Sequence, residues 1–214
     1  MRIALAGNPN SGKTTMYNAL TGRNEKVGNW AGVTVEKKEA KLKKSYYKGN
    51  EEIIIVDLPG AYSMSPFTSE ESVTSIYVKE QAPDVIINIV DATNLSRSLF
   101  FTTQLLELNI PVVVALNKSD LNDKKENTVD SKKLQELLKC PVVDTVSTSS
   151  KGLKKLIEEA IKVIGKEQVS VYKALDINVS TKENAELSDR HRFEFVNEIV
   201  KQVETRKVLT SDTT

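Results

Sequence analysis

The chain carries a glycine-rich motif between a short strand-like segment and a stretch of helical character. Residues 7–14 read Gly-Asn-Pro-Asn-Ser-Gly-Lys-Thr and follow the segment 2–6, Arg-Ile-Ala-Leu-Ala. Glycines let the backbone wrap closely around an anion, so that amide N–H groups and the next helix start face it. Lys13 adds a positive charge, and the Thr14 hydroxyl suits Mg²⁺. The spacing predicts a phosphate-binding loop in an α/β fold of the P-loop NTPase class.

A second motif, Asn117-Lys118-Ser119-Asp120, indicates which nucleotide is bound. A carboxylate such as Asp120 accepts from the adjacent N1–H and 2-amino donors of guanine, whereas adenine has no donors there. A mismatch of this kind is worth about 10⁴-fold in selectivity. We expect Asn117 to tie this loop to the phosphate loop and the Lys118 stem to lie along the base. Residues Ser147, Thr148 and Ser149 follow the last predicted strand and are expected to support guanine through backbone groups. The predicted ligand is GTP.

The hydrophobic pattern alternates between strands and helices. Several strands are continuous apolar runs, as in a parallel sheet covered by helices on both faces. We therefore expect a Ras-like, mostly parallel six-stranded sheet flanked by helices. A lysine-rich stretch, 35–44, fits an edge strand, and Thr68-Ser-Glu-Glu71 fits a helix capping box. The predicted strands are 2–7, 34–44, 52–57, 84–91, 111–117 and 141–146, and the predicted helices 13–22, 69–80, 97–108, 131–139 and 152–164.

The chain is expected to contain two parts. Residues 1–165 form the predicted GTP-binding domain, and 166–214 a small helical appendage. A capping-box pattern at Ser180–Glu183 and helical spacing of apolar residues from Asp189 onward support the appendage. The polar end, 209–214, fits either a frayed terminus or the cut end of a longer protein.

Composition excludes several classes of protein. With 30 Lys and Arg against 29 Asp and Glu, the net charge of +1 gives no bias toward nucleic acid. The single cysteine, Cys140, excludes an internal disulfide and suits a reducing compartment. No apolar stretch approaches the ~20 residues needed to cross a bilayer. We expect the chain as given to be soluble.

Phosphoryl transfer needs positioning and positive charge where negative charge builds. In Asp57-Leu58-Pro59-Gly60, Asp57 is placed to hold Mg²⁺ through a water and the Gly60 N–H to reach the γ-phosphate. Thr34, in Gly32-Val33-Thr34, lies in a segment that can close over the nucleotide and is the candidate for a second Mg²⁺ ligand. Ordinary turn and strand roles remain the alternatives for Asp57 and Thr34. The predicted nucleotide contacts are completed by Gly7, Asn8, Pro9, Asn10, Ser11, Gly12, Lys13, Thr14 and Thr15.

Two absences shape the predicted mechanism. Many GTPases carry a water-orienting glutamine directly after the glycine that corresponds to Gly60, but here the residue is Ala61. No arginine is placed to act as an arginine finger, since Arg23 lies only near the mobile segment that carries Thr34. The side-chain oxygen of Asn10, inside the phosphate loop, offers an alternative, because with phosphate oxygens it can hold a monovalent cation. The predicted catalytic residues are Asn10, Lys13, Thr34 and Gly60.

Three segments together resemble a known family. The phosphate loop, Val27-Gly-Asn-Trp-Ala-Gly-Val-Thr-Val-Glu36 and Asp57-Leu-Pro-Gly-Ala-Tyr-Ser-Met-Ser-Pro66 are similar to the amino-terminal region of the bacterial ferrous iron transport protein B family. The resemblance covers residues 1–165. It implies that Asn10 coordinates potassium, with further ligands from the backbone carbonyls of Gly28 and Trp30.

The resemblance also implies a larger setting. In this family slow, potassium-stimulated GTP hydrolysis regulates ferrous iron uptake through an attached transmembrane permease. The domain would then lie at the cytoplasmic face of the bacterial inner membrane, with small cytosolic accessory proteins and a homo-oligomer as further expected partners. Two departures stand out. Many relatives have methionine in place of Lys118, and the helical appendage, which restrains nucleotide release in the family, is short here.

Two other functions stay open. A free-standing GTPase of ribosome assembly would share the asparagine-containing loop, but it would carry an RNA-binding module or a basic stripe, and residues 166–214 show neither. A nucleotide-dependent switch with incidental hydrolysis is the other possibility.

Overall fold

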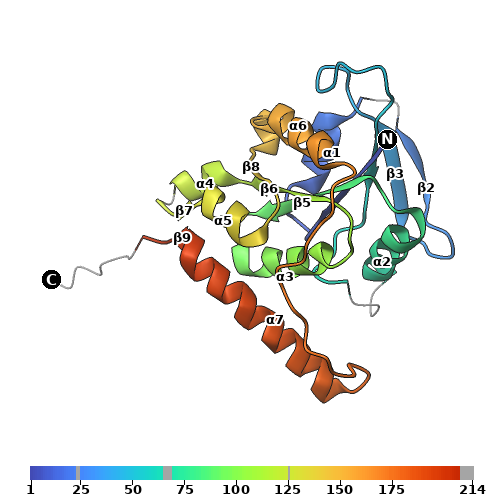
Figure 1. The fold of residues 1–214 in the computed structure, drawn as a ribbon. Helices are drawn as coiled ribbons and strands as arrows, with labels where there is room; N and C mark the ends of the chain where they lie inside the picture. The colour runs from blue at the N-terminus through green and yellow to red at the C-terminus, as the bar shows by residue number, and fades with distance from the viewer. Residues whose placement is uncertain (23–24, 65–68, 125, 208–214) are drawn as a thin grey trace.

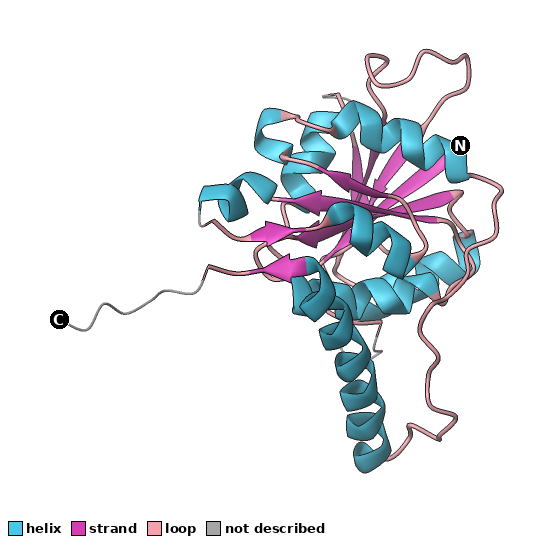
Figure 2. Ribbon diagram, turned by 60° about the vertical axis from the view of Figure 1, so that its left-hand side comes forward, coloured by secondary structure: helices cyan, strands magenta, loops and turns pink. Residues whose placement is uncertain are grey.

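The computed structural model describes residues 1–22, 25–64, 69–124 and 126–207. A seven-stranded sheet lies at the centre, in the order β2-β3-β4-β1-β5-β6-β8, with helices on both faces (Figures 1 and 2). The strands of this sheet are β1 (Arg2–Gly7), β2 (Lys26–Asn29), β3 (Glu36–Lys41), β4 (Ile54–Asp57), β5 (Val85–Asp91), β6 (Val112–Asn117) and β8 (Val142–Asp144). The helices are α1 (Lys13–Leu20), α2 (Ser69–Gln81), α3 (Leu95–Leu106), α4 (Ser119–Lys124), α5 (Ser131–Leu138), η1 (Ser147–Ser149), α6 (Leu153–Val163) and α7 (Lys182–Val203).

The central strand β1 shows why the sheet is covered twice. It pairs in parallel with β4 on one side and β5 on the other. Ile3 and Leu5 pack into the core under α1 and α6, whereas Ala4 and Ala6 face the helices of the opposite layer. All four are fully buried, because successive strand residues point to opposite faces. The predicted α/β class is confirmed, and the parallel strands place their carboxyl ends at one edge.

The sheet has seven strands among the described residues, where the sequence predicted six. The additional strand is β2, in the segment expected to be a mobile loop, and it pairs antiparallel with β3. Its sequence, Lys-Val-Gly-Asn, has no apolar alternation, and all four residues are exposed. Backbone pairing alone defines it, which is why the pattern gave no signal. The edge of the sheet is therefore β2 and not the lysine-rich β3.

A small second sheet was also not predicted. It pairs β7 (Thr128–Val129) with β9 (Glu204–Thr205) in antiparallel register. These two-residue strands are too short to show a period. The pairing fixes the end of α7 beside the segment that precedes α5.

The C-terminal helix α7 is 22 residues long and packs against α3 and α5. It begins at Lys182, within the predicted capping-box segment 180–183 and before the apolar spacing that starts at Asp189. Its N-cap is Thr181, whose hydroxyl accepts from the Asn184 N–H at 3.3 Å. The predicted Ser180 capping box is therefore wrong by one residue. The first turns carry few apolar side chains, so periodicity could not reveal them. In Figure 1 this end of α7 extends away from the body of the molecule.

A buried arginine anchors α7 to α3. The Arg192 guanidinium pairs with Glu107 at 3.0 Å and donates to the Thr103 hydroxyl at 3.1 Å. Its charge also lies 4.3 Å from the Tyr172 ring centroid. Such a buried cation is tolerated because it is paired and hydrogen-bonded.

Some residues named in the sequence analysis lie outside the part of the chain that the structure describes. These are Arg23, Thr68 of the first capping box and the tail 209–214.

The single cysteine has a packing role. Burial raises the pKa of the Cys140 thiol to about 12, so this side chain stays protonated and packs as an apolar group. Within the described part of the chain, no helix combines the length and apolarity needed to cross a bilayer.

Candidate nucleotide-binding site

The glycine-rich loop joins β1 directly to α1, with Gly12 at the N-cap. Gly12 has a left-handed backbone, φ +94°, and a Cβ there would lie 2.2 Å from the Asn117 side-chain nitrogen. Only glycine fits this position. α1 has no side-chain cap and no acidic residue in its first turn. Its first N–H groups are therefore available to an anion, with the helix dipole favouring negative charge.

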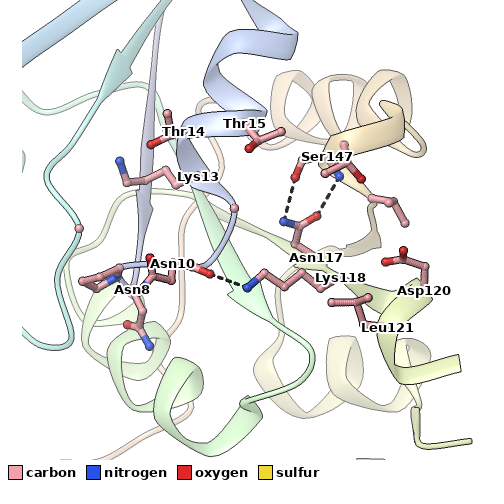
Figure 3. A pocket seen from close by; sticks show the side chains of 15 residues that line it. Asn8, Asn10, Lys13, Thr14, Thr15, Asn117, Lys118, Asp120, Leu121 and Ser147 are labelled. Atoms are coloured by element: carbon pink, nitrogen blue, oxygen red, sulfur yellow. Dashed lines mark hydrogen bonds between the residues drawn. The ribbon is translucent and has the colours of Figure 1, made fainter. Parts of the chain in front are cut away.

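A pocket of about 620 Å³ opens over this loop, at the carboxyl ends of the parallel strands (Figure 3). Most of its lining comes from the residues that the sequence predicted to contact GTP. Two lining residues were missed, Leu121 and Val146, although each directly adjoins a predicted one. The lining consists of Asn8, Pro9, Asn10, Gly12, Lys13, Thr14, Thr15, Gly60, Asn117, Lys118, Asp120, Leu121, Val146, Ser147 and Thr148.

Asn117 joins three segments of the site. Its amide nitrogen donates to the Ser11 carbonyl at 2.9 Å and to the Ser147 hydroxyl at 3.1 Å, and its amide oxygen accepts from the Ser147 N–H at 3.1 Å. The side chain is buried, so these bonds are shielded from water. The phosphate loop, the Asn-Lys-x-Asp loop and the 147–149 turn are thereby held together around one pocket.

Lys118 and Asp120 occupy different parts of this pocket. The Lys118 ammonium donates to the Asn10 carbonyl at 2.5 Å and pairs with Asp91 at 3.0 Å. Its stem therefore spans the distance from β6 to the phosphate loop. The carboxylate of Asp120 lies on the far side of the pocket, near Leu121, as Figure 3 shows. The charged ends of these two side chains are thus separated along one pocket.

Lys13 and Asp57 form an ion pair beside the phosphate loop. Both side chains are nearly buried, at 10% and 13% exposure. The pairing neutralises Lys13 and keeps it over the loop. A hard divalent cation prefers oxygen ligands. The Thr14 hydroxyl lines the pocket, and the Asp57 carboxylate lies just outside the lining, against Lys13. This donor set fits Mg²⁺.

The loop after Asp57 is fixed to the phosphate loop through its backbone. The Ala61 N–H donates to the Gly7 carbonyl at 3.1 Å, and a Cβ on Gly60 would lie 3.2 Å from the Pro9 ring. Ala61 is buried within the apolar core. A polar, water-orienting side chain at this position would therefore have to leave the core.

The hairpin formed by β2 and β3 holds the remaining predicted residues. Its tip is closed by the Trp30 N–H donating to the Val35 carbonyl at 2.9 Å. The buried Trp30 ring packs edge-on against Tyr77 of α2, with centroids 5.3 Å apart. The structure does not bring the hairpin residues Gly28, Trp30, Gly32, Val33 and Thr34 into the pocket lining.

Other predicted contacts lie just outside the lining. They are the last residues of β1 and β4 or lie in the segments that carry the lining, with Ser11 and Leu58 buried and Ser149 exposed. Leu58 donates its N–H to the Leu5 carbonyl at 3.1 Å, which fixes the start of its loop. The predicted contacts that lie outside the pocket lining in this way are Gly7, Ser11, Asp57, Leu58, Pro59 and Ser149.

A mostly parallel sheet with a glycine-rich loop between its central strand and α1 defines the P-loop NTPase fold. Residues 1–160 match the family model described as ferrous iron transport protein B. The chain belongs to this family.

Curated relatives agree. The chain is 46% identical over 160 residues to the Fe(2+) transporter FeoB of Salmonella typhimurium, and 44% identical to that of Escherichia coli. Each match covers 73% of this chain and 20% of the relative. The chain thus matches about a fifth of the length of these transporters.

Solved structures show the same fold. The cytosolic domain of L. pneumophila FeoB superposes with a TM-score of 0.85 at 29% identity, covering 96% of this chain and 100% of that one. A GDP-bound mutant of S. thermophilus NFeoB gives 0.82 at 30% identity, with the same coverage. The T. maritima FeoB cytosolic domain in its GMPPNP form gives 0.83 at 27% identity, covering 96% and 99%.

Proposed function

We propose that this chain binds GTP and hydrolyses it slowly to GDP and phosphate. One observation carries the proposal: the Asn117 side chain bonds the phosphate loop to the Asn-Lys-x-Asp loop, so that both loops line the same pocket. This arrangement joins an anion site to a carboxylate that suits guanine. Relatives solved with GDP and GMPPNP support the choice of ligand.

The residues present support a division of roles. The N–H groups at the start of α1 and the Lys13 ammonium bind the phosphates, and Asp120 accepts from the guanine donors. When bound, Mg²⁺ would neutralise the charge that builds on the phosphate oxygens. Thr14 would hold it directly and Asp57 through a water, with Thr34 as a second ligand once the hairpin approaches. The Gly60 N–H would donate to the γ-phosphate.

A potassium ion is proposed as the second activating ion. Asn10 lies at the pocket with a left-handed backbone, φ +64°, and its side-chain oxygen would be the first ligand. The carbonyls of Gly28 and Trp30 would follow when the hairpin closes. Support comes from Ala61, whose buried, apolar environment leaves no water-orienting side chain after Gly60.

GTP turnover is accordingly expected to be faster in KCl than in NaCl. Asn10→Ala should remove this difference and leave GDP binding largely intact, because the N–H groups that bind the phosphates belong to the backbone. Phosphate release in the two salts, with GDP affinity measured in parallel, tests this. Equal rates for the wild-type chain in both salts would rule out the potassium role.

The hairpin gives a second expected result. Trp30 is the single tryptophan of the chain, and it is 8% exposed against Tyr77. If the hairpin closes over GTP, this packing must change, and the tryptophan emission with it. Fluorescence should therefore differ between the GDP and GMPPNP complexes. Identical spectra in both complexes, at saturating nucleotide, would show that the hairpin stays on α2.

The larger setting is also a proposal. We take residues 1–165 as the nucleotide-binding domain and 166–214 as a short helical domain that restrains nucleotide release. In the whole protein they would serve a permease domain for ferrous iron at the cytoplasmic face of the inner membrane. Membership of the transporter family favours this over a free-standing ribosome-assembly GTPase. A switch with incidental hydrolysis remains the second candidate, distinguished by the turnover measurements.

A further inference from the structure

Arg97 lies in the first turn of α3, next to the phosphate loop, and has no role in the mechanism above. Its guanidinium carbon is 3.7 Å from the centroid of the Tyr62 ring. At this distance a planar guanidinium stacks on the ring face, a geometry that a lysine ammonium does not reproduce. Tyr62 comes two residues after Gly60. The contact therefore joins α3 to the loop that faces the phosphates.

The stack completes the attachment of that loop. On one side the Ala61 N–H donates to the Gly7 carbonyl at 3.1 Å. On the other side the Met64 N–H donates to the Gln104 side chain of α3 at 2.8 Å. Tyr62 lies between these two bonds and is half-buried. Its contact with Arg97 therefore attaches the loop to α3 between these two bonds.

The stacked pair also closes a small polar pocket of about 200 Å³ against the phosphate loop. Asn8 lines this pocket with a buried amide oxygen that has no hydrogen-bond partner among the described residues, and Figure 3 shows its amide pointing away from Lys13. Lys118 and Asp91, also in the lining, neutralise each other. Among the described residues Arg97 forms no ion pair, and it lines this pocket together with Asn10.

We infer that Arg97 is a positioning residue for GTP hydrolysis. By stacking on Tyr62 it holds residues 60–62 against the phosphate loop, so that the Gly60 N–H stays at the terminal phosphate. This rests on the proposed GTPase function. Because GDP lacks the terminal phosphate, its binding does not use this contact. Removing the stack therefore slows hydrolysis without weakening GDP binding.

The test compares single-turnover hydrolysis at saturating GTP. Arg97→Ala and Tyr62→Ala are each expected to lower the rate about tenfold, the upper part of the range for one cation–π contact. GDP affinity should stay within about twofold, as for an interaction made only with the triphosphate. The double variant should be no slower than either single one, because both remove the same contact. Tyr62→Phe keeps the ring and should retain the rate.

The controls separate positioning from folding. Arg190→Ala removes an exposed arginine of α7, far along the chain, and should leave the rate unchanged. Should Arg97→Ala fail to fold, Arg97→Lys keeps the charge but not the planar stack, and it should be slower than wild type. A wild-type rate in the Arg97 variants, additive losses in the double variant, or a parallel loss of GDP affinity would overturn the positioning role alone. Absence of hydrolysis by the wild-type chain would overturn the GTPase function as well.

Discussion

Asp120→Asn is expected to weaken GDP binding by about 100-fold or more. The carboxylate offers two acceptors to the N1–H and 2-amino donors of guanine, whereas an amide offers one acceptor and places N–H donors against the other. A buried donor facing a donor loses its hydrogen bond and is not compensated by water. Calorimetric titration with GDP measures the loss directly.

Xanthosine diphosphate (XDP), whose base has an acceptor where guanine has its 2-amino donor, provides the matched control. Xanthine carries a carbonyl oxygen in place of the 2-amino group, so the amide of Asp120→Asn can donate to it. The variant should therefore bind XDP more tightly than the wild-type chain does. Unchanged GDP affinity in Asp120→Asn would contradict the role of this carboxylate in base recognition.

Lys13→Ala is expected to have an equally large effect on the phosphate side of the pocket. It removes the side-chain cation from the loop and leaves Asp57, only 13% exposed, without its partner. An unpaired carboxylate near the phosphates repels them. Both GTP binding and hydrolysis should therefore fall by about 100-fold or more, as expected when a charge-assisted hydrogen bond is removed from a desolvated site.

The same variant must be shown to fold. Lys154→Ala removes an exposed lysine of α6 and should match the wild-type chain in both nucleotide affinity and thermal unfolding. If Lys13→Ala unfolds as the wild type does and still binds GTP with wild-type affinity, the phosphate loop does not act through its lysine.

Much of this architecture could be predicted because its signals are local. The runs that became β1, β5 and β6 are continuous and apolar, and the Gly7–Thr14 spacing needs no partner to be recognised. The sequence predicted that Asn117 links its loop to the phosphate loop, but not that its partners are Ser11 and Ser147. These hydrogen bonds depend on how the ends of the strands come together in the fold.

Other elements could not be predicted for physical reasons. β2 exists through backbone pairing with β3, which no side-chain pattern encodes. The first turns of α7 are polar and show no apolar period, so only the capping-box pattern indicated where the helix begins, and it did so one residue before the observed Thr181 cap. The contact between Arg97 and Tyr62 joins residues far apart in sequence, and an isolated arginine in a helix carries no signal of its own. The position of the hairpin could not be predicted either. A lone tryptophan such as Trp30 suggests a packing anchor, but the sequence does not indicate that Tyr77 is the ring it packs against.

The central claim is that this pocket binds and hydrolyses GTP. Phosphate release from GTP and from ATP by the wild-type chain, with Mg²⁺ and KCl, tests it most directly, with Lys13→Ala as the background. We predict release from GTP above that background and none above it from ATP. Equal release from both nucleotides, or none from GTP, would contradict the claim.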